Sequence, residues 1–253
     1  MRVAIYTCVT GDYDPIRRPR HVDPRFDYYC FTDNPKKVSP PWRYQQIDLT
    51  SLDPKDQNRY IKMLPHKLEV LAPYNLTLYL DGSIEIVGDL RALIDHAMGR
   101  GGNMFLYEHP SRRCIYAEAA ACSHYAHDWV WFIARQMRRY SNEGYPANNG
   151  LFEANVIIRR PTPEISDLMD AWWTEYMNGA KRDQLSLPYV AWKHSINIVS
   201  LGQSDPRFGG RYFLLNNHKK RFSAISIMRK YVNRGIGRLI PNDVLYDPGP
   251  KSK

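Results

Sequence analysis

Short apolar runs alternate with longer amphipathic stretches along this chain, a pattern typical of strands and helices that pack as an α/β protein. Apolar or β-favouring runs, each predicted to form a strand, cover residues 2–7, 26–31, 42–47, 76–80, 103–107 and 155–159. Apolar residues at three- and four-residue spacing predict helices over residues 56–71, 89–98, 116–140 and 163–176. Asp89 and Pro163 suit the first positions of two of these helices, and Pro65 should kink or restart the first.

Asp81 follows the apolar run at residues 76–80 and ends it abruptly. Gly82 relaxes the backbone where a strand leaves the sheet, and the carboxyl ends of such strands are where open α/β sheets bind ligands. We therefore expect Asp81 to stand at a rim facing a cleft, where its replacement by Asn leaves the fold intact. A carboxylate there either holds a divalent cation that binds the phosphates of a nucleotide-sugar, or caps its own turn.

Polar turns also follow the first two predicted strands. The first strand ends at Thr7, and the loop after it contains Gly11 and Tyr13. Nucleotide-binding α/β proteins often place their ligand after the first strand, although this loop matches no G-x-G-x-x-G or Walker motif. Asp33 follows the second strand, where its carboxylate suits either a base or ribose or the capping of its own backbone.

Three cationic or titratable residues, Arg59, Lys62 and His66, share one stripe of the predicted helix at residues 56–71. Such a stripe is usually a solvated face. Because this helix directly precedes the strand that ends at Asp81, we expect Arg59 and Lys62 to face phosphate groups.

His124, His127 and Asp128 lie in the stretch 116–140, which is predicted to be one long helix. Histidines at positions i and i+3 can share a metal ion, which would allow a metal-dependent hydrolase of a lipid or glycan. The stretch contains no H-E-x-x-H motif and no evident third ligand.

The composition is that of an ordinary globular protein with an excess of positive charge. The 253 residues carry a net charge of +9, which favours an anionic partner without choosing among nucleotide, glycan, nucleic acid and membrane. The sequence shows neither a signal peptide nor an apolar membrane span, so we expect a cytoplasmic protein. Four widely spaced cysteines are expected to be reduced, buried thiols.

No acidic residue occurs between Arg207 and Arg238, and residues 225–240 are amphipathic. This segment is expected either to pack as a basic solvated helix or to rest on an anionic membrane, at the inner face of the plasma membrane. We divide the chain into a catalytic domain at residues 1–221 and a basic C-terminal segment with a disordered tail at 222–253.

Several motifs, in order along the chain, resemble the plant and bacterial glycosyltransferase-like family that was formerly a domain of unknown function and whose plant members are named for turgor and mucilage phenotypes. The motifs are A-I-Y-T at residues 4–7, F-T-D at 31–33, R-x-x-K-x-x-P-H at 59–66, L-D-G-S-I at 80–84, Y-A-E-A at 116–119, V-I-I-R at 156–159 and R-D-Q-L-S at 182–186. Each motif is short, but the ordered set is specific.

The resemblance implies a glycosyltransferase A fold, with a central mixed, mostly parallel sheet flanked by helices. The chain also resembles, more distantly, the glycogenin-like retaining transferases. That likeness implies that Asp81, Ser83 and His218 hold a divalent cation, Mn or Mg, and that Asp183 and Gln184 face the transferred sugar. Ser83 stands where those enzymes have a second Asp, and its hydroxyl is a weaker cation ligand, so metal dependence is an open question. If the strand continues past Asp81, Glu85 alternates onto the same face as Asp81 and Ser83.

The leading hypothesis is therefore an enzyme that moves a sugar from a nucleotide-sugar, with a UDP-sugar as the expected donor, to a glycan or lipid-linked acceptor in cell-surface polysaccharide biosynthesis. Positive charge from a cation or from Arg59, Lys62 and Lys219 would stabilise the leaving diphosphate. Glu118 is a third candidate catalytic residue, and a retaining mechanism is preferred to inversion. The alternatives are the hydrolase above and a non-catalytic binder of anionic polymers; no nucleic-acid-binding module is recognisable.

Overall fold

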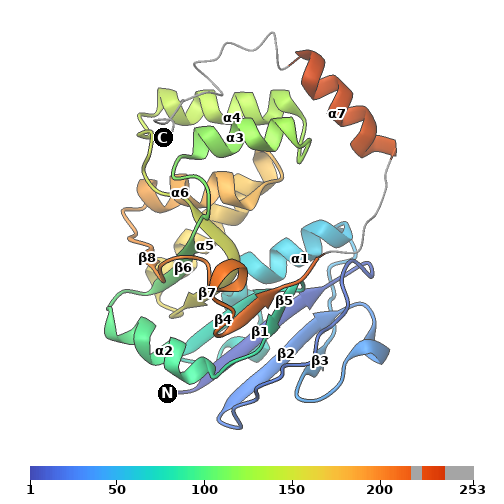
Figure 1. Ribbon diagram of the computed structural model, residues 1–253, viewed down its shortest axis with the longest axis vertical. Helices are drawn as coiled ribbons and strands as arrows, with labels where there is room; N and C mark the ends of the chain where they lie inside the picture. The colour runs from blue at the N-terminus through green and yellow to red at the C-terminus, as the bar shows by residue number, and fades with distance from the viewer. Residues whose placement is uncertain (218–223, 237–253) are drawn as a thin grey trace. The chain divides into compact units, whose positions relative to one another are not determined.

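The computed structural model describes residues 1–217 and 224–236 (Figure 1). The chain forms two compact units. Of the described residues, the first contains Met1–Glu108, Glu153–Trp173 and 197–217, and the second contains His109–Phe152, Thr174–Ile196 and 224–236. No helix in the described ranges is long and apolar enough to cross a membrane.

Every strand predicted from an apolar run is present, and three short strands were not predicted. The strands are β1 (Val3–Val9), β2 (Phe26–Thr32), β3 (Arg43–Gln45), β4 (Leu76–Asp81), β5 (Ile84–Ile86), β6 (Met104–Glu108), β7 (Phe152–Arg159), β8 (Val199–Ser200) and β9 (Phe213–Leu215). The helices are α1 (Pro54–Met63), α2 (Leu90–Gly99), α3 (Ile115–His124), α4 (Val130–Asn142), α5 (Pro163–Asn178), α6 (Asp183–Lys193) and α7 (Ala224–Ile236), with a π-turn at Asp205–Gly209.

The first unit is built on a seven-stranded sheet in the order β3-β2-β1-β4-β7-β6-β8. Strands β1, β2, β3 and β4 pair in parallel, as do β6 and β8, whereas β7 is antiparallel to β4. The Arg160 amide, just after β7, donates to the Asn103 carbonyl, just before β6, so β6 also runs against β7. Strands β4 and β6 therefore share a direction, and the prediction of a mixed, mostly parallel sheet is confirmed.

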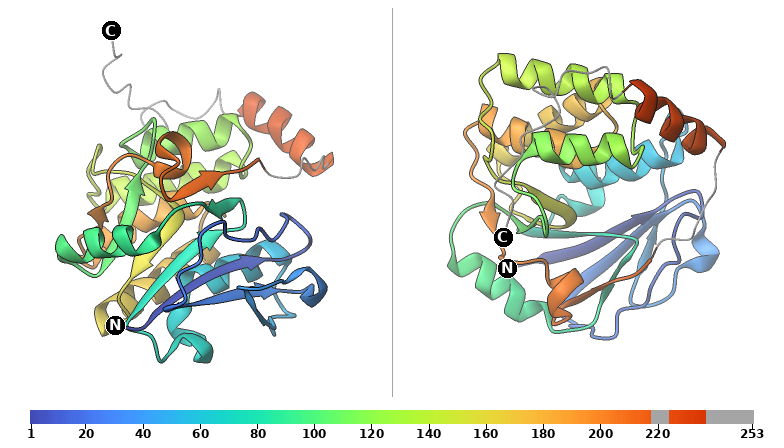
Figure 2. Two further views of the ribbon diagram at one scale, coloured as in Figure 1. Left: turned by 60° about the horizontal axis from the view of Figure 1, so that its bottom comes forward. Right: turned by 45° about the horizontal axis from the view of Figure 1, so that its top comes forward.

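Each face of this sheet is covered by helices because side chains alternate across a strand. Leu80 and Tyr107 belong to the core that includes the apolar side of α2. On the opposite face, the Arg159 guanidinium donates to the main-chain oxygen of Lys62 in α1 at 2.8 Å. Figure 2, on the right, shows α1 in light blue and α2 in green on opposite sides of the sheet. Residues on one strand can therefore serve two separate sites.

Two of the predicted elements are corrected. The chain leaves the sheet at Asp81, and β5 pairs with β9 in a separate two-stranded sheet, so Glu85 does not share a strand face with Asp81. The predicted helix at residues 116–140 is two helices, because Ala126 adopts a left-handed conformation with φ of 58°. The Asp128 carboxylate then accepts the amide of Trp129, at the start of α4.

In the second unit, α3 contacts α4, α6 and α7. Helix α7 is tied to the turn after α3 by Asn233, which is 3% exposed. Its side chain accepts the Val130 amide at 3.0 Å and donates to the carbonyls of Ser123 and Asp128, at 3.0 and 2.8 Å. A polar contact therefore fixes the inward side of α7.

Candidate functional site

The turns after β1, β2 and β4 are neighbours at the carboxyl edge of the sheet, because these strands are adjacent and parallel. Gly11 and Asp12 both adopt positive φ, near 59° and 53°, which folds the loop after β1 back over the edge. The amide of Gly11 donates to the exposed carboxylate of Asp33 at 2.8 Å. Tyr13 is 50% exposed on the same loop. An aromatic ring and a carboxylate therefore lie at the edge where α/β sheets bind ligands.

Asp81 is the last residue of β4, and its carboxylate is the counter-ion of a buried lysine. The Lys62 side chain is only 1% exposed, and its ammonium lies 3.3 Å from Asp81 Oδ1. The Tyr79 hydroxyl donates to the same oxygen at 2.9 Å. Burial, and next the Asp81 charge, raise the pKa of Tyr79 well above its usual value, so the phenol stays protonated. Asp81 is 24% exposed rather than fully on a rim.

Thr7 and Arg59 also lie at this edge. The buried Thr7 hydroxyl donates to the carbonyl of Leu80 at 2.8 Å, which ties β1 to β4. Arg59 is half-buried beside Asn58, whose amide donates to the Cys8 carbonyl at 2.6 Å. The structure therefore brings Arg59, Lys62 and Asp81 together, with Lys62 directed at Asp81 instead of outward.

His66 does not join this cluster. Helix α1 begins at the carboxyl edge, where the Pro54 carbonyl accepts the Thr10 hydroxyl. α1 ends at Met63, and His66 lies in the short 3₁₀ turn Pro65–Lys67 that follows it. There His66 Nε2 lies 3.1 Å from the carboxylate of Asp170. Burial lowers the pKa of His66, and Asp170 only partly opposes this effect.

The described residues do not make a complete divalent-cation site. Across 1–217 and 224–236, no three His, Cys, Asp or Glu side chains converge on one point. Ser83 is buried, and Asp81 Oδ1 already receives an ammonium and a phenol. Glu85 pairs instead with Arg20 at 2.7 Å. The other predicted ligand, His218, and the predicted phosphate contact Lys219 lie outside the described residues.

A second cluster, in the second unit, surrounds the buried carboxylate of Glu118 on α3. Arg112 lies 2.6 Å from one of its oxygens and Arg182 lies 3.3 Å from the other. His109 Nε2 is 3.6 Å away, and its Nδ1 accepts two main-chain amides. Burial alone would raise the pKa of Glu118, but Arg182 and Arg112 outweigh it and hold the pKa below its usual value. Glu118 is therefore a fixed negative charge that positions two arginines.

Asp183 and Gln184 begin α6, and both are buried. Asp183 Oδ1 accepts the amide of the next residue, Gln184, at 3.1 Å. The Gln184 side-chain oxygen accepts a hydrogen bond from Arg182, which links this pair to Glu118. The second unit thus brings together the three residues predicted to be catalytic, through an arginine that the prediction did not include.

The histidine pair considered for a hydrolase does not share one helix, and no group of three potential metal ligands forms around it among the described residues. α3 ends at His124, so His127 lies beyond the helix and the i, i+3 spacing loses its meaning. Both oxygens of Asp128 accept main-chain amides, from Trp129 at 2.8 Å and from Lys181 at 2.6 Å. These contacts make Asp128 a structural cap.

Sequence reasoning missed Tyr79, Arg112 and Arg182 as parts of these clusters. Tyr79 sits on an apolar strand, where an aromatic residue looks like core. Arg112 and Arg182 come from separate loops, and only the buried Glu118 shows why they matter. One signal was available: Arg182 directly precedes the Asp183-Gln184 pair.

Comparison with known proteins gives one family and one fold. The model of the TOD1/MUCI70 glycosyltransferase-like domain matches residues 32–202. Among solved structures, mouse xyloside xylosyltransferase 1 in its apo form superposes with a TM-score of 0.50 at 10% identity, over 79% of this chain and 85% of that chain. No curated protein matches the sequence. At this identity the structural likeness shows the fold, which is of glycosyltransferase A type.

Proposed function

Because the chain belongs to the TOD1/MUCI70 glycosyltransferase-like family, we propose that it transfers a sugar from a nucleotide-sugar donor to a glycan or lipid-linked acceptor. A UDP-sugar is the expected donor, cell-surface polysaccharide biosynthesis the expected setting, and retention the preferred stereochemistry. The observation that carries the proposal is Asp81, which ends β4 at the carboxyl edge with Lys62 and Tyr79 on its carboxylate. This is the edge at which an α/β sheet receives a nucleotide.

The loop after β1 and the turn after β2 are the proposed nucleotide site. The exposed ring of Tyr13 offers a surface on which a base stacks. The Asp33 carboxylate, held by the Gly11 amide, accepts hydrogen bonds from the ribose or the base. This hydrogen bond from the Gly11 amide keeps the loop close to the sheet before the donor arrives, which lowers the entropic cost of ordering the loop on binding.

Arg59 is the proposed phosphate ligand in the described part of this edge. Negative charge develops on the diphosphate as the sugar bond breaks, and a positioned guanidinium stabilises it. Lys62 does not contact the diphosphate in this proposal. Its buried ammonium neutralises the Asp81 carboxylate, which would otherwise repel the diphosphate. The described residues do not fit a self-contained cation site, so this mechanism assigns no step to a metal ion.

Asp183 and Gln184 are proposed to act on the transferred sugar, as the likeness to glycogenin-type enzymes implies. Replacing Asp183 by Ala should keep donor affinity and abolish transfer. If donor affinity and melting temperature collapse together in that variant, Asp183 serves only as the cap at the start of α6.

Donor binding is the direct test. Titration calorimetry with UDP, GDP, ADP and CMP compares the unmodified protein with Arg59→Gln, and donor-panel hydrolysis then identifies the sugar. Losing a charge-assisted hydrogen bond of about 1.5–3 kcal/mol should weaken the nucleotide by roughly 10- to 100-fold. Arg43→Gln is the matched control, since Arg43 is exposed on the outer strand β3 and pairs with Asp27 at 2.8 Å. Binding of none of the four nucleotides would remove the proposal.

We also propose that α7 rests on an anionic membrane, where a lipid-linked acceptor would be found. Its outward side carries apolar residues that are between 39% and 70% exposed: Ile225, Ile227, Met228, Tyr231 and Ile236. Asn233 and Arg229 instead face the rest of the second unit, where Arg229 donates to the His127 carbonyl at 3.1 Å. The helix therefore presents its apolar side to solvent, with exposed Lys230 and Arg234 beside it.

Co-sedimentation with phosphatidylglycerol vesicles tests this membrane contact. Each basic residue near an anionic surface contributes about 1 kcal/mol, so Lys230→Gln with Arg234→Gln should weaken binding about 30-fold. Arg229 is left unchanged because it holds the helix to the unit. Lys36→Gln with Arg100→Gln, two exposed cations of the first unit, is the control. If the unmodified protein stays in the supernatant at low salt, the apolar side of α7 does not bind an anionic membrane and the proposal is wrong.

A further inference from the structure

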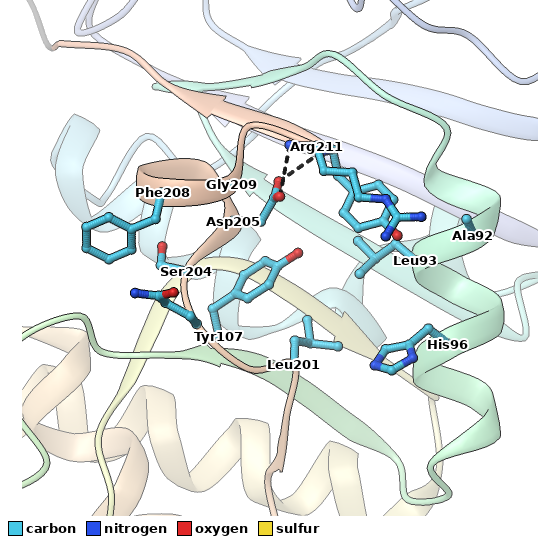
Figure 3. Close-up of a pocket in the computed structure, with 12 residues that line it drawn as sticks. Ala92, Leu93, His96, Tyr107, Leu201, Ser204, Asp205, Phe208, Gly209 and Arg211 are labelled. Atoms are coloured by element: carbon cyan, nitrogen blue, oxygen red, sulfur yellow. Dashed lines mark hydrogen bonds between the residues drawn. The ribbon is translucent and has the colours of Figure 1, made fainter.

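A pocket of about 430 Å³ lies within the first unit, between α2, the end of β6 and the π-turn (Figure 3). This volume is in the range of small-molecule sites. The pocket is on the sheet face that α2 covers, because its floor residue Tyr107 shares a core with Leu80. Tyr79 and Asp81 alternate with Leu80 on β4 and face the other way. The pocket is therefore separate from the Lys62–Asp81 cluster.

The floor of the pocket holds a polar group that has nothing to bind in the described structure. Tyr107 is 2% exposed, and its hydroxyl is buried without a hydrogen-bond partner among residues 1–217 and 224–236. Figure 3 shows this hydroxyl pointing into the space between the π-turn and α2. Burying a hydroxyl without a partner destabilises a protein, and a Phe ring would fill the same volume without that cost. A ligand that bonds the hydroxyl explains why a tyrosine stands there.

The loop that forms one wall is held rigid before any ligand arrives. Asp205 accepts the main-chain amides of Arg211, Tyr212 and Phe213, each at 2.9 Å. A Cβ on Gly88 would lie 1.9 Å from the Arg211 carbonyl, so only glycine lets the loop approach so closely. A preformed wall of this kind lowers the conformational cost of binding.

The walls combine apolar surface with donors and acceptors. Leu93 and Leu201 are buried side chains of the apolar part, while His96 and Arg211 stand exposed at the mouth. The Arg211 guanidinium lies 5.0 Å from the centre of the Tyr212 ring, which holds it beside the opening. A sugar ring matches this combination, because it has apolar C–H faces and a rim of hydroxyls that both donate and accept.

We propose that this pocket binds one pyranose unit of a glycan, with a ring hydroxyl bonded to Tyr107 and another near Arg211. The inference rests on the proposed transferase function, because an acceptor or product glycan is the natural source of such a unit. Its place on the α2 face makes it a holding site for the glycan chain, apart from the proposed donor site at Asp81.

Saturation-transfer difference NMR tests the pocket with free glucose, galactose, mannose, xylose, rhamnose, N-acetylglucosamine and glucuronate as probes at millimolar concentration. At least one sugar should give a signal that Tyr107→Phe reduces several-fold and that Arg211→Gln also weakens. Tyr125→Phe, a change at a tyrosine that is 66% exposed in the second unit, is the matched control and should leave the signal unchanged. The absence of a Tyr107-dependent signal for all seven sugars overturns the proposal.

A second measurement shows whether the Tyr107 hydroxyl is structural. Tyr107→Phe should keep or raise the melting temperature, and a fall of several degrees would show a structural partner and overturn the inference. UDP titration separates this proposal from the donor proposal. Sugar binding at Tyr107 without any nucleotide binding would leave a glycan-binding protein, whereas nucleotide binding alone would leave a transferase without this holding site.

Discussion

Replacing Asp81 by Asn should destabilise the protein, because the change leaves the buried ammonium of Lys62 without its counter-ion. The Lys62 side chain is 1% exposed and lies 3.3 Å from the carboxylate. From position alone, a residue at a strand end would tolerate the change. The structure reverses that expectation, since an amide oxygen cannot compensate a full positive charge.

The magnitude follows from the burial of the two partners. Breaking a fully buried ion pair costs about 3–5 kcal/mol. Asp81 is 24% exposed, so water partly replaces it, and we expect a loss of about 2 kcal/mol. For a chain of this size, that corresponds to a fall in melting temperature of about 4–8 °C. Lys62→Met should cost less, about 1 kcal/mol, because Asp81 can hydrate and keeps the Tyr79 hydroxyl.

A double-mutant cycle measured by urea unfolding checks the reasoning. The variant with both Asp81→Asn and Lys62→Met should lie within about 1 kcal/mol of the unmodified protein, which gives a coupling of about 2 kcal/mol. Asp12→Asn is the control: it breaks an exposed pair with Lys37 and should cost less than about 1 kcal/mol. An Asp81→Asn midpoint equal to that of the unmodified protein, with no coupling, would refute the burial of Lys62 against Asp81.

Three further predictions concern other parts of the molecule. The folded-state pKa of Glu118 is lowered, so its stabilising contribution is complete above the unfolded value near 4.5 and is lost as pH falls through the folded value. The melting temperatures of Glu118→Gln and the unmodified protein should therefore differ most near neutral pH and converge in acid; a constant difference would contradict the ion pairs. Asn233→Ala removes hydrogen bonds to three main-chain groups, so trypsin should cut after Arg229 or Lys230 faster than in the unmodified protein, and equal rates would show that other contacts hold α7. Donor turnover should persist in EDTA, because Arg59 supplies positive charge to the diphosphate without a metal; complete loss that Mn²⁺ restores would show that residues beyond the described set complete a cation site.

Local patterns in the sequence determined most of the secondary structure. A strand was predicted correctly wherever an apolar run ended in a polar turn, as at Asp81, because buried strands and their turns differ in composition over a few residues. Asp89 was predicted as a helix cap, and its side chain does accept the Arg91 amide at 2.9 Å. The strands β5, β8 and β9 were missed because each has only two or three residues and, unlike β3 within the predicted run 42–47, none was recognised as part of a longer run.

The positions of candidate site residues were predictable where a charged or polar side chain lies at the end of a predicted strand, and less so elsewhere. Asp33, Arg59 and Asp81 lie at the predicted edge, since parallel neighbours place their turns together. His66 was predicted to share a helical stripe with Arg59 and Lys62. The helix ends at Met63, before His66, so the three side chains do not lie on one helix face and need not contact the same ligand.

The sequence by itself determined that this is an α/β protein with candidate donor residues at strand ends, because alternation and turn residues are local properties, whereas the glycosyltransferase A type followed only from the resemblance of its ordered motifs to a known family. Only the tertiary structure decided which charges compensate one another: Lys62 against Asp81, and Arg112 and Arg182 against Glu118. It also decided that Tyr107 forms the floor of a pocket. Such pairings depend on which segments meet after folding, and burial, which sets the strength of each interaction, exists only once they have met.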